Sequence, residues 1–187
     1  MIGFSNKKAE VSSVIEFIAR SSSQSASLRA LAEGLKRAGT TIAQVDSERK
    51  LAAIFANAAD IARDAQATDA TRMDALNLVI LDTPQQAVPA LVACLDKTQS
   101  ETVQSAAVSA LGHFSGNEVT GAIIEGWPGL RKKARTAAFV VLLARPERAS
   151  ALLHAIGSKK SATGDLAASD AQALFKHKVP AVAALAD

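Results

Sequence analysis

The chain has 187 residues, of which 49% are hydrophobic and only 4% are aromatic, with no tyrosine. Its 21 basic and 18 acidic residues leave a formal charge of +3, which is too small to imply a polyanionic partner by itself. A single cysteine, Cys94, excludes an intrachain disulfide. Much of the hydrophobic content is alanine, the strongest helix former, so the composition predicts an all-α protein with closely spaced helices.

The first 68 residues predict irregular helices. Residues 1–8 are expected to form an N-terminal tail, and they lack the apolar core of a signal peptide. Helical apolar spacing then predicts helices over 9–20, 25–39 and 47–65, with Gly39 ending the second of them. Loops are expected at 21–25 and at GTTIAQVD (39–46). The residues expected to be buried are Val11, Val14, Ile15, Ile18, Leu28, Leu31, Ala32, Leu35, Leu51, Ile54, Phe55, Ala58 and Ile61.

From residue 69 to residue 160 the sequence repeats with a period of roughly 31 residues. Three segments align at Ala75, Ala107 and Ala138, and each is followed by a second apolar stretch. The other aligned positions are Leu76, Val108 and Phe139; Val79, Leu111 and Leu142; and Val88, Val119 and Ala149. Within each segment the apolar residues have helical spacing, so each repeat predicts a pair of helices.

Turn residues separate the predicted helices of the repeats. Pro84 and Pro146 are expected near helix starts, Gly116 at a helix break, and Ser100 followed by Glu101 at a helix N-terminus. After a polar linker, GSKKSATG (157–164), a further helix is predicted at 165–177, and 179–187 looks like the opening of another repeat. We therefore predict one domain over 9–187, an all-α α-α superhelix (a HEAT-like solenoid) of about nine or ten helices, with C-terminal helices over 165–187. Because the last repeat stops midway, we expect the chain to be a piece of a longer protein.

Several short motifs of the second half resemble one particular family: WPGL (127–130), RPE (145–147), LLHAI (152–156), DL (165–166) and 174–182. From about Met73 to its end, the chain resembles the HEAT-repeat region of planctomycete-type membrane-bound dehydrogenase-like proteins that carry a C-terminal haem-binding (cytochrome c) domain. The resemblance implies an extracytoplasmic or periplasmic location, a β-propeller upstream and the cytochrome downstream. The C-x-x-C-H motif is missing from this sequence, so haem is expected only in the downstream domain and no cofactor in this chain.

The basic cluster Arg131, Lys132, Lys133 and Arg135 precedes the apolar run 137–144. We interpret it as the solvent-exposed start of a helix. Positive charge opposes the helix dipole there, which leaves open that the cluster binds an anionic partner. Nucleic acid is the alternative considered, but the scarcity of aromatic residues argues against base stacking.

No catalytic or metal-binding pattern is found. His113, His154 and His177 lie far apart, and none has a His, Cys, Asp or Glu at the spacing of a helical metal site. Cys94 is expected to be buried as a small hydrophobe, and Trp127 to fill the space between repeats.

The predicted function is a non-enzymatic HEAT-repeat scaffold or protein–protein interaction domain from a multidomain redox protein. The alternative is a helical-repeat nucleic-acid-binding protein or a DNA-glycosylase-like enzyme that uses a basic concave face. The expected partner is another domain of the same polypeptide or a separate protein, with no membrane contact by this domain. The candidate contact residues are Gln85, Gln86, Glu118, Glu125, Arg148, His154, Arg131, Lys132 and Arg135.

Overall fold

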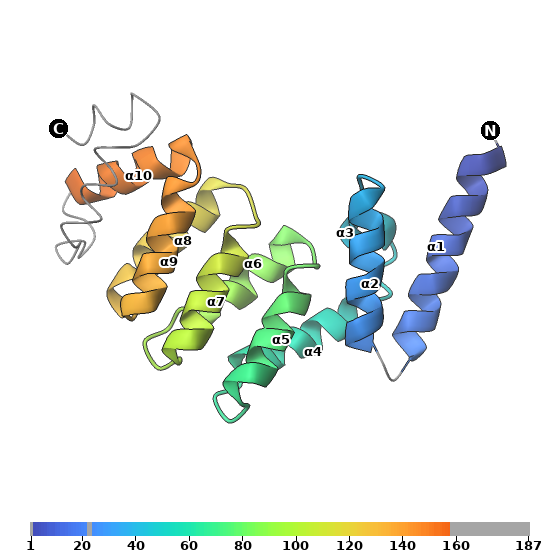
Figure 1. Cartoon of the computed structure of the whole chain (residues 1–187), viewed down its shortest axis with the longest axis horizontal. Helices are drawn as coiled ribbons and strands as arrows, with labels where there is room; N and C mark the ends of the chain where they lie inside the picture. Colours follow the sequence, from blue (N-terminus) through green and yellow to red (C-terminus); the bar gives the residue numbers. More distant parts are fainter. Residues whose placement is uncertain (1, 22–23, 158–187) are drawn as a thin grey trace. The chain divides into compact units, whose positions relative to one another are not determined.

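The computed structural model describes residues 2–21 and 24–157, and over these residues the chain is helical and contains no strand (Figure 1). The all-α prediction and the predicted number of helices are confirmed over that part of the chain. The predicted linker beyond Gly157, the C-terminal helices and His177 lie outside the described residues. The elements are α1 (Ile2–Arg20), α2 (Gln24–Arg37), α3 (Ile42–Val45), α4 (Ala52–Arg63), α5 (Asp69–Val79), α6 (Pro84–Ala93), α7 (Glu101–Leu111), α8 (Asn117–Gly126), the 3-10 helix η1 (Trp127–Gly129), α9 (Lys132–Leu143) and α10 (Pro146–Gly157).

The chain forms two compact units, and the boundary between them falls inside α6. Unit 1 comprises residues 1–90, and unit 2 comprises residues 91–187. In unit 1, α1, α2 and α3 pack together, and α5 packs against both α2 and α4. In unit 2, α9 packs against α7 and α10, and α10 also packs against α8. Unit 2 thus places equivalent helices of successive pairs against each other, as Figure 1 shows for α7 and α9, which is typical of a helical-repeat solenoid.

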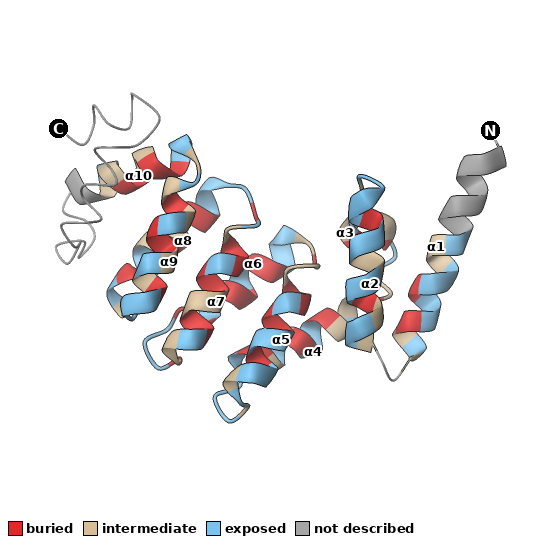
Figure 2. Cartoon of the chain, in the orientation of Figure 1, coloured by how far each residue is buried: buried red, intermediate tan, exposed pale blue. Residues whose placement is uncertain are grey.

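The predicted register of the repeats is confirmed. The exposed fractions of Ala75, Ala107 and Ala138 are 4%, 0% and 0%. Alanine at the contact lets α7 and α9 approach closely, because interaxial distance depends on the side chains between helices. The other aligned positions are buried too: Leu76, Val108, Phe139, Val79, Leu111, Leu142, Val88, Val119 and Ala149. Figure 2 shows buried residues in red along the helices of the repeats.

The predicted helix boundaries of the repeats are also found. Pro84 and Pro146 are the first residues of α6 and α10, where a missing N–H is harmless. The hydroxyl of Ser100 accepts a hydrogen bond from an amide in the first turn of α7. Gly39 and Gly116 have φ angles of 73° and 125°, a backbone region that favours glycine, and they mark the end of α2 and the start of α8.

The N-terminal tail prediction is corrected, since α1 begins at Ile2 rather than Ala9. The prediction counted only apolar periodicity, whereas Lys7, Lys8 and Ala9 are good helix formers that continue the helix without an apolar stripe. Further along α1, Ile15 and Ile18 are buried as expected.

The expected core of the N-terminal helices is confirmed only in part. Val14 was expected inside but is 43% exposed, and five other positions are only half-buried. The half-buried positions are Val11, Leu31, Ala32, Ile54 and Ile61. Five of the expected core residues in this region are buried: Leu28 and Leu35 of α2, Leu51 just before α4, and Phe55 and Ala58 of α4.

The stretch GTTIAQVD is not entirely a loop, because it contains α3. Thr41 and Gln44 form a capping box: the Thr41 hydroxyl accepts from the Gln44 amide at 3.3 Å, and the Gln44 side chain accepts from the Thr41 amide at 3.0 Å. Ile42 is 2% exposed and anchors this short helix in the core. The capping pattern was present in the sequence, but a single buried apolar residue is too weak a periodic signal to predict a helix.

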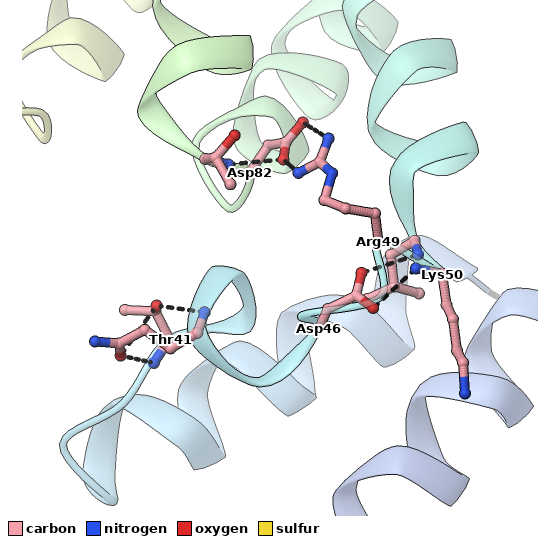
Figure 3. A network of polar contacts seen from close by, with 8 residues as sticks. Thr41, Asp46, Arg49, Lys50 and Asp82 are labelled. Atoms are coloured by element: carbon pink, nitrogen blue, oxygen red, sulfur yellow. Dashed lines mark hydrogen bonds and ion pairs between the residues drawn. The ribbon is translucent and has the colours of Figure 1, made fainter.

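A polar turn precedes α4 in unit 1 (Figure 3). The Asp46 carboxylate accepts hydrogen bonds from the amides of Lys50 (2.9 Å) and Leu51 (3.0 Å). Arg49, inside this turn, has a φ of 57°, which is uncommon for a residue with a side chain. Leu51, the N-cap residue of α4, has no side chain that can cap the helix. The Asp46 carboxylate therefore supplies the acceptor for the amides that lead into α4.

The guanidinium of Arg49 reaches across to the turn before α6, where it forms an ion pair with Asp82 (Figure 3). Asp82 also accepts from the Thr83 amide at 2.7 Å, and its side chain is only 7% exposed. The hydrogen bond that Arg49 donates to the Asp82 carboxylate holds the pKa of Arg49 above its ordinary value. One ion pair therefore joins the turn before α4 to the turn before α6.

Candidate interaction groove

An open groove with a volume of about 610 Å³ lies in unit 2. Its walls come from the last turn of α6 and the loop after it on one side, and from α8 and η1 on the other. Small and apolar side chains dominate, and three charged residues lie among them. The lining residues are Val92, Ala93, Leu95, Asp96, Lys97, Ala122, Glu125, Gly126, Pro128 and Gly129.

Two glycines on the α8 and η1 wall of this groove face the segment around Leu95 and Lys97. A Cβ atom on Gly126 would lie 3.4 Å from the Leu95 side chain. On Gly129, it would lie 3.6 Å from the Lys97 amide nitrogen and 3.7 Å from the Leu95 carbonyl oxygen. Beside them, Trp127 is 2% exposed and packs into the core as predicted. The sequence WPG therefore forms a tight 3-10 turn with its aromatic ring inside and its small residues on the groove wall.

The loops beside the groove are held together by Gln104, a fully buried residue on α7. Its Nε2 donates to the carbonyl oxygens of Leu95 (3.0 Å), Asp96 (2.9 Å) and Gly129 (3.0 Å). Its Oε1 accepts from the Arg131 amide at 2.8 Å. One neutral side chain thus bonds to four backbone groups of two loops, 95–97 and 129–131, of which the Asp96 carbonyl also accepts from the Gln99 amide at 3.0 Å.

The start of α9 is capped by residues of α7 instead of its own N-cap residue. The Arg131 side chain does not cap the helix. Instead, the Gln104 side chain accepts a hydrogen bond from the Arg131 amide, and the Glu101 carboxylate accepts one from the Lys133 amide at 2.8 Å. The side chains of Arg131, Lys132 and Lys133 are exposed, as predicted for a solvated helix start. Arg135 is half-buried, and its Nε donates to the Leu130 carbonyl at 2.9 Å.

Lys97 extends this positive surface. Its backbone lies against Gly129, on the loop that leads into Arg131, and its side chain is exposed. We call the exposed side chains of Lys97, Arg131, Lys132 and Lys133 the basic edge of the groove. Among the described residues, no ion pair includes a member of the basic edge.

Two carboxylates lie in the groove itself. Asp96 Oδ1 accepts from the Thr98 hydroxyl (2.6 Å) and the Thr98 amide (2.9 Å), and these bonds hold the pKa of Asp96 below its ordinary value of 3.8. Glu125 is exposed on α8, on the opposite wall. The groove therefore has an apolar floor with acidic groups inside and the basic edge beside it.

The predicted contact residues are distributed unevenly. Gln85 and Gln86 are exposed on α6 in unit 1, and Glu118 and His154 are exposed in unit 2. Of the predicted contact residues, Glu125 alone lines the groove, although Arg131 and Lys132 belong to its basic edge. Sequence reasoning missed the small residues of the groove walls, such as Ala93 and Ala122. The usable signal was the glycine and proline content around Trp127, which indicated close packing but not a groove.

Arg148 is a correction, because it is 2% exposed and cannot contact a partner. Its guanidinium donates to the Phe114 carbonyl, and a second nitrogen lies 3.5 Å from the Val141 carbonyl. Burial, together with the charge of Arg145, lowers the pKa of Arg148. The prediction failed because the aliphatic part of an arginine can pack inside while its head group bonds to backbone carbonyls.

The described residues contain no group of three or more His, Cys, Asp and Glu side chains that could hold a metal ion. His113 is exposed, and Cys94 is buried as predicted. Over the same part of the chain, the helices are too short or too polar to cross a bilayer.

Comparison with known families identifies one repeat. The family model described as the Armadillo/beta-catenin-like repeat matches residues 84–116, which cover α6, α7 and the turn after α7. No curated protein and no solved structure matches the chain. The match and the stacked helices support an all-α fold of the Armadillo/HEAT-like helical-repeat type. Such repeats commonly mediate protein interactions, through surfaces that stacked helices build together.

Proposed function

We propose that this chain is a non-enzymatic scaffold whose unit 2 groove docks a segment of a protein partner. The observation that carries the proposal is the groove, with its volume of about 610 Å³ and its walls of small apolar side chains. The loops that line it are held by Gln104, so it is preformed. A preformed apolar groove lowers the entropic cost of binding an extended chain.

The partner is proposed to be another domain of the same polypeptide. The resemblance to dehydrogenase-like proteins with a haem-binding domain supports this proposal. An intramolecular partner benefits from a high effective concentration, so a single groove with few anchors suffices. The flanking coding sequence tests it: a C-x-x-C-H motif after residue 187 supports the proposal, and an unrelated downstream domain contradicts it.

The groove itself is tested by filling it. Peptides selected from a random library on the wild-type protein are titrated into Ala93→Arg, in which a long charged side chain enters the groove wall. We expect at least a tenfold loss of affinity, equivalent to about 1.4 kcal/mol. The matched control is Ala144→Arg, because Ala144 is also exposed but lies at the end of α9, outside the groove.

Amide chemical shifts provide the second readout. Selected peptides are expected to shift the amides of Val92, Ala122, Gly126 and Gly129. Equal affinities of the two arginine variants, or shifts that fall outside these walls, would show that the groove is not the docking site.

A further inference from the structure

We propose that the basic edge binds the carboxylates of an acidic stretch in the partner segment, with the adjoining apolar residues of that segment lying in the groove. This inference rests on the proposed function. It adds the chemistry of the bound segment, with its acidic part at the basic edge and its apolar part in the groove. It assigns a role to Lys97, Arg131, Lys132 and Lys133 that packing does not explain.

The basic edge is built from segments that Gln104 holds together. Its residues come from two loops that are distant in sequence, 95–97 and 129–131, and from the first turn of α9. Gln104 donates to carbonyls of both loops and accepts the Arg131 amide, so the backbones that carry the four cations are held together. A chain that meets Lys97 at the groove wall therefore meets Arg131 close by.

The lysines at the start of α9 do not stabilise that helix. Lys132 and Lys133 lie in the first turn of α9, where positive charge opposes the helix dipole. Glu101 uses one carboxylate oxygen to accept a hydrogen bond from the Lys133 amide. Residues that oppose stability and lack an ion pair within the described part of the chain are typical of a surface retained for binding.

A peptide fits this surface better than a nucleic acid does. The three aromatic residues other than histidine in the described part of unit 2, Phe114, Trp127 and Phe139, are buried, so none can stack on a base. A nucleic-acid backbone carries a phosphate at every nucleotide, and one that continued from the edge into the groove would meet Asp96 and Glu125. A peptide backbone is neutral, so it can place its carboxylates at the edge and its apolar side chains in the groove.

The test uses a fluorescent synthetic peptide with a glutamate-rich half and a half of leucine, alanine and proline. Its analogue carries glutamine in place of every glutamate. The wild-type chain is expected to bind the acidic peptide about tenfold more tightly than the analogue, because several exposed ion pairs each add a small gain in affinity. The preference is expected to shrink as the salt concentration rises from about 0.01 M to about 0.15 M, because salt screens exposed charges.

The variant with Arg131→Gln, Lys132→Gln and Lys133→Gln removes most of the edge. It is expected to bind both peptides with the weaker affinity, while its helical circular dichroism stays unchanged. The matched control, Arg20→Gln, Lys36→Gln and Arg37→Gln, removes the same charge from exposed positions of unit 1. We expect the control to keep the wild-type preference within about twofold.

Four results would overturn the inference. One is equal binding of the two peptides by the wild type. The second is an equal loss of affinity in the two triple variants, which would indicate only long-range attraction. The third is unfolding of the edge variant, which would show that the cations stabilise the fold. The fourth is tighter binding of single-stranded DNA than of the acidic peptide, with amide shifts at Lys97 and Arg131.

The failure of this inference is distinguishable from failure of the groove. If Ala93→Arg abolishes peptide binding while the edge variant does not change it, the groove binds a segment and the acidic chemistry is wrong. If neither change affects binding, both proposals are wrong.

Discussion

In unit 1, an ion pair joins two of the turns between helices. In unit 2, the neutral side-chain amide of one glutamine joins two other turns. Arg49 and Asp82 link the turns before α4 and α6, and Gln104 links the loops before α7 and α9. A guanidinium only donates hydrogen bonds, so Arg49 needs an acceptor opposite it, which the Asp82 carboxylate supplies. An amide both donates and accepts, so Gln104 satisfies carbonyls and an amide without any charge.

The same difference is seen at one aligned position of the repeats, three residues before the aligned alanine. Gln104 lies three residues before Ala107, and the equivalent residues are Arg72 in α5 and Arg135 in α9. Each donates to a backbone carbonyl that precedes its helix: Arg72 to Ala62, in the last turn of α4, at 2.9 Å, and Arg135 to Leu130, in the turn before α9, at 2.9 Å. The repeat therefore keeps a polar anchor at this position while its chemistry changes, and the two units should respond differently to mutation and to salt.

The largest expected effect comes from replacing Gln104 with leucine. Leucine is similar in size but leaves the Leu95 and Gly129 carbonyls and the Arg131 amide without the Gln104 side chain, whereas the Asp96 carbonyl keeps the Gln99 amide. Each unsatisfied buried group costs roughly 1–3 kcal/mol. Some of these groups regain water, so we expect a loss of about 3 kcal/mol or more in the free energy of unfolding, measured by urea titration. Gln85→Leu, at an exposed position of α6, should change it by less than about 0.5 kcal/mol. Similar losses for the two variants would contradict the anchoring role of Gln104.

A smaller effect is expected for Asp82→Asn in unit 1. Asparagine retains an oxygen for the Thr83 amide but loses the charge that pairs with Arg49, whose side chain is 39% exposed. We expect a loss of about 1 kcal/mol that decreases with added salt, unlike the loss caused by Gln104→Leu. Asp74→Asn removes the more exposed pair with Arg29 and should cost less. A loss for Asp82→Asn that does not change with salt would show that the ion pair is not what joins the two turns.

The smallest effect concerns Glu16 and Lys50, a pair at 2.6 Å between α1 and the turn before α4. The hydrogen bond and the charge of Lys50 hold the pKa of Glu16 below its ordinary value of 4.5. A carboxylate whose pKa is lowered by folding stabilises the protein above its unfolded pKa, and this contribution disappears as the pH falls through the folded value. The difference in Tm between wild type and Glu16→Gln should therefore be present at neutral pH and vanish in acid. Glu33→Gln, at an exposed position of α2, serves as the control, and a difference that persists in acid would contradict the assignment.

Much of the fold was predictable from the sequence, whereas little of the candidate site was. The basic cluster was recognised as exposed, because charged residues at a helix start follow simple rules. The groove was not recognised, because its walls consist of small residues such as Ala122 that are equally common inside a helical core. Arg148 was misplaced for the opposite reason, since its charge suggested exposure while its carbonyl partners lie on other segments.

The sequence by itself determined the helices of the repeats and their register. Helical periodicity and an alanine that recurs at every repeat are local signals, and Ala75, Ala107 and Ala138 are all buried as a result. Only the tertiary structure decided which polar residues became buried anchors. Gln104 looks like any surface glutamine in its own helix, and its role depends on carbonyls from two other loops. The groove, and the position of Lys97 beside the basic cluster, were likewise decided in three dimensions, because they arise where those loops meet.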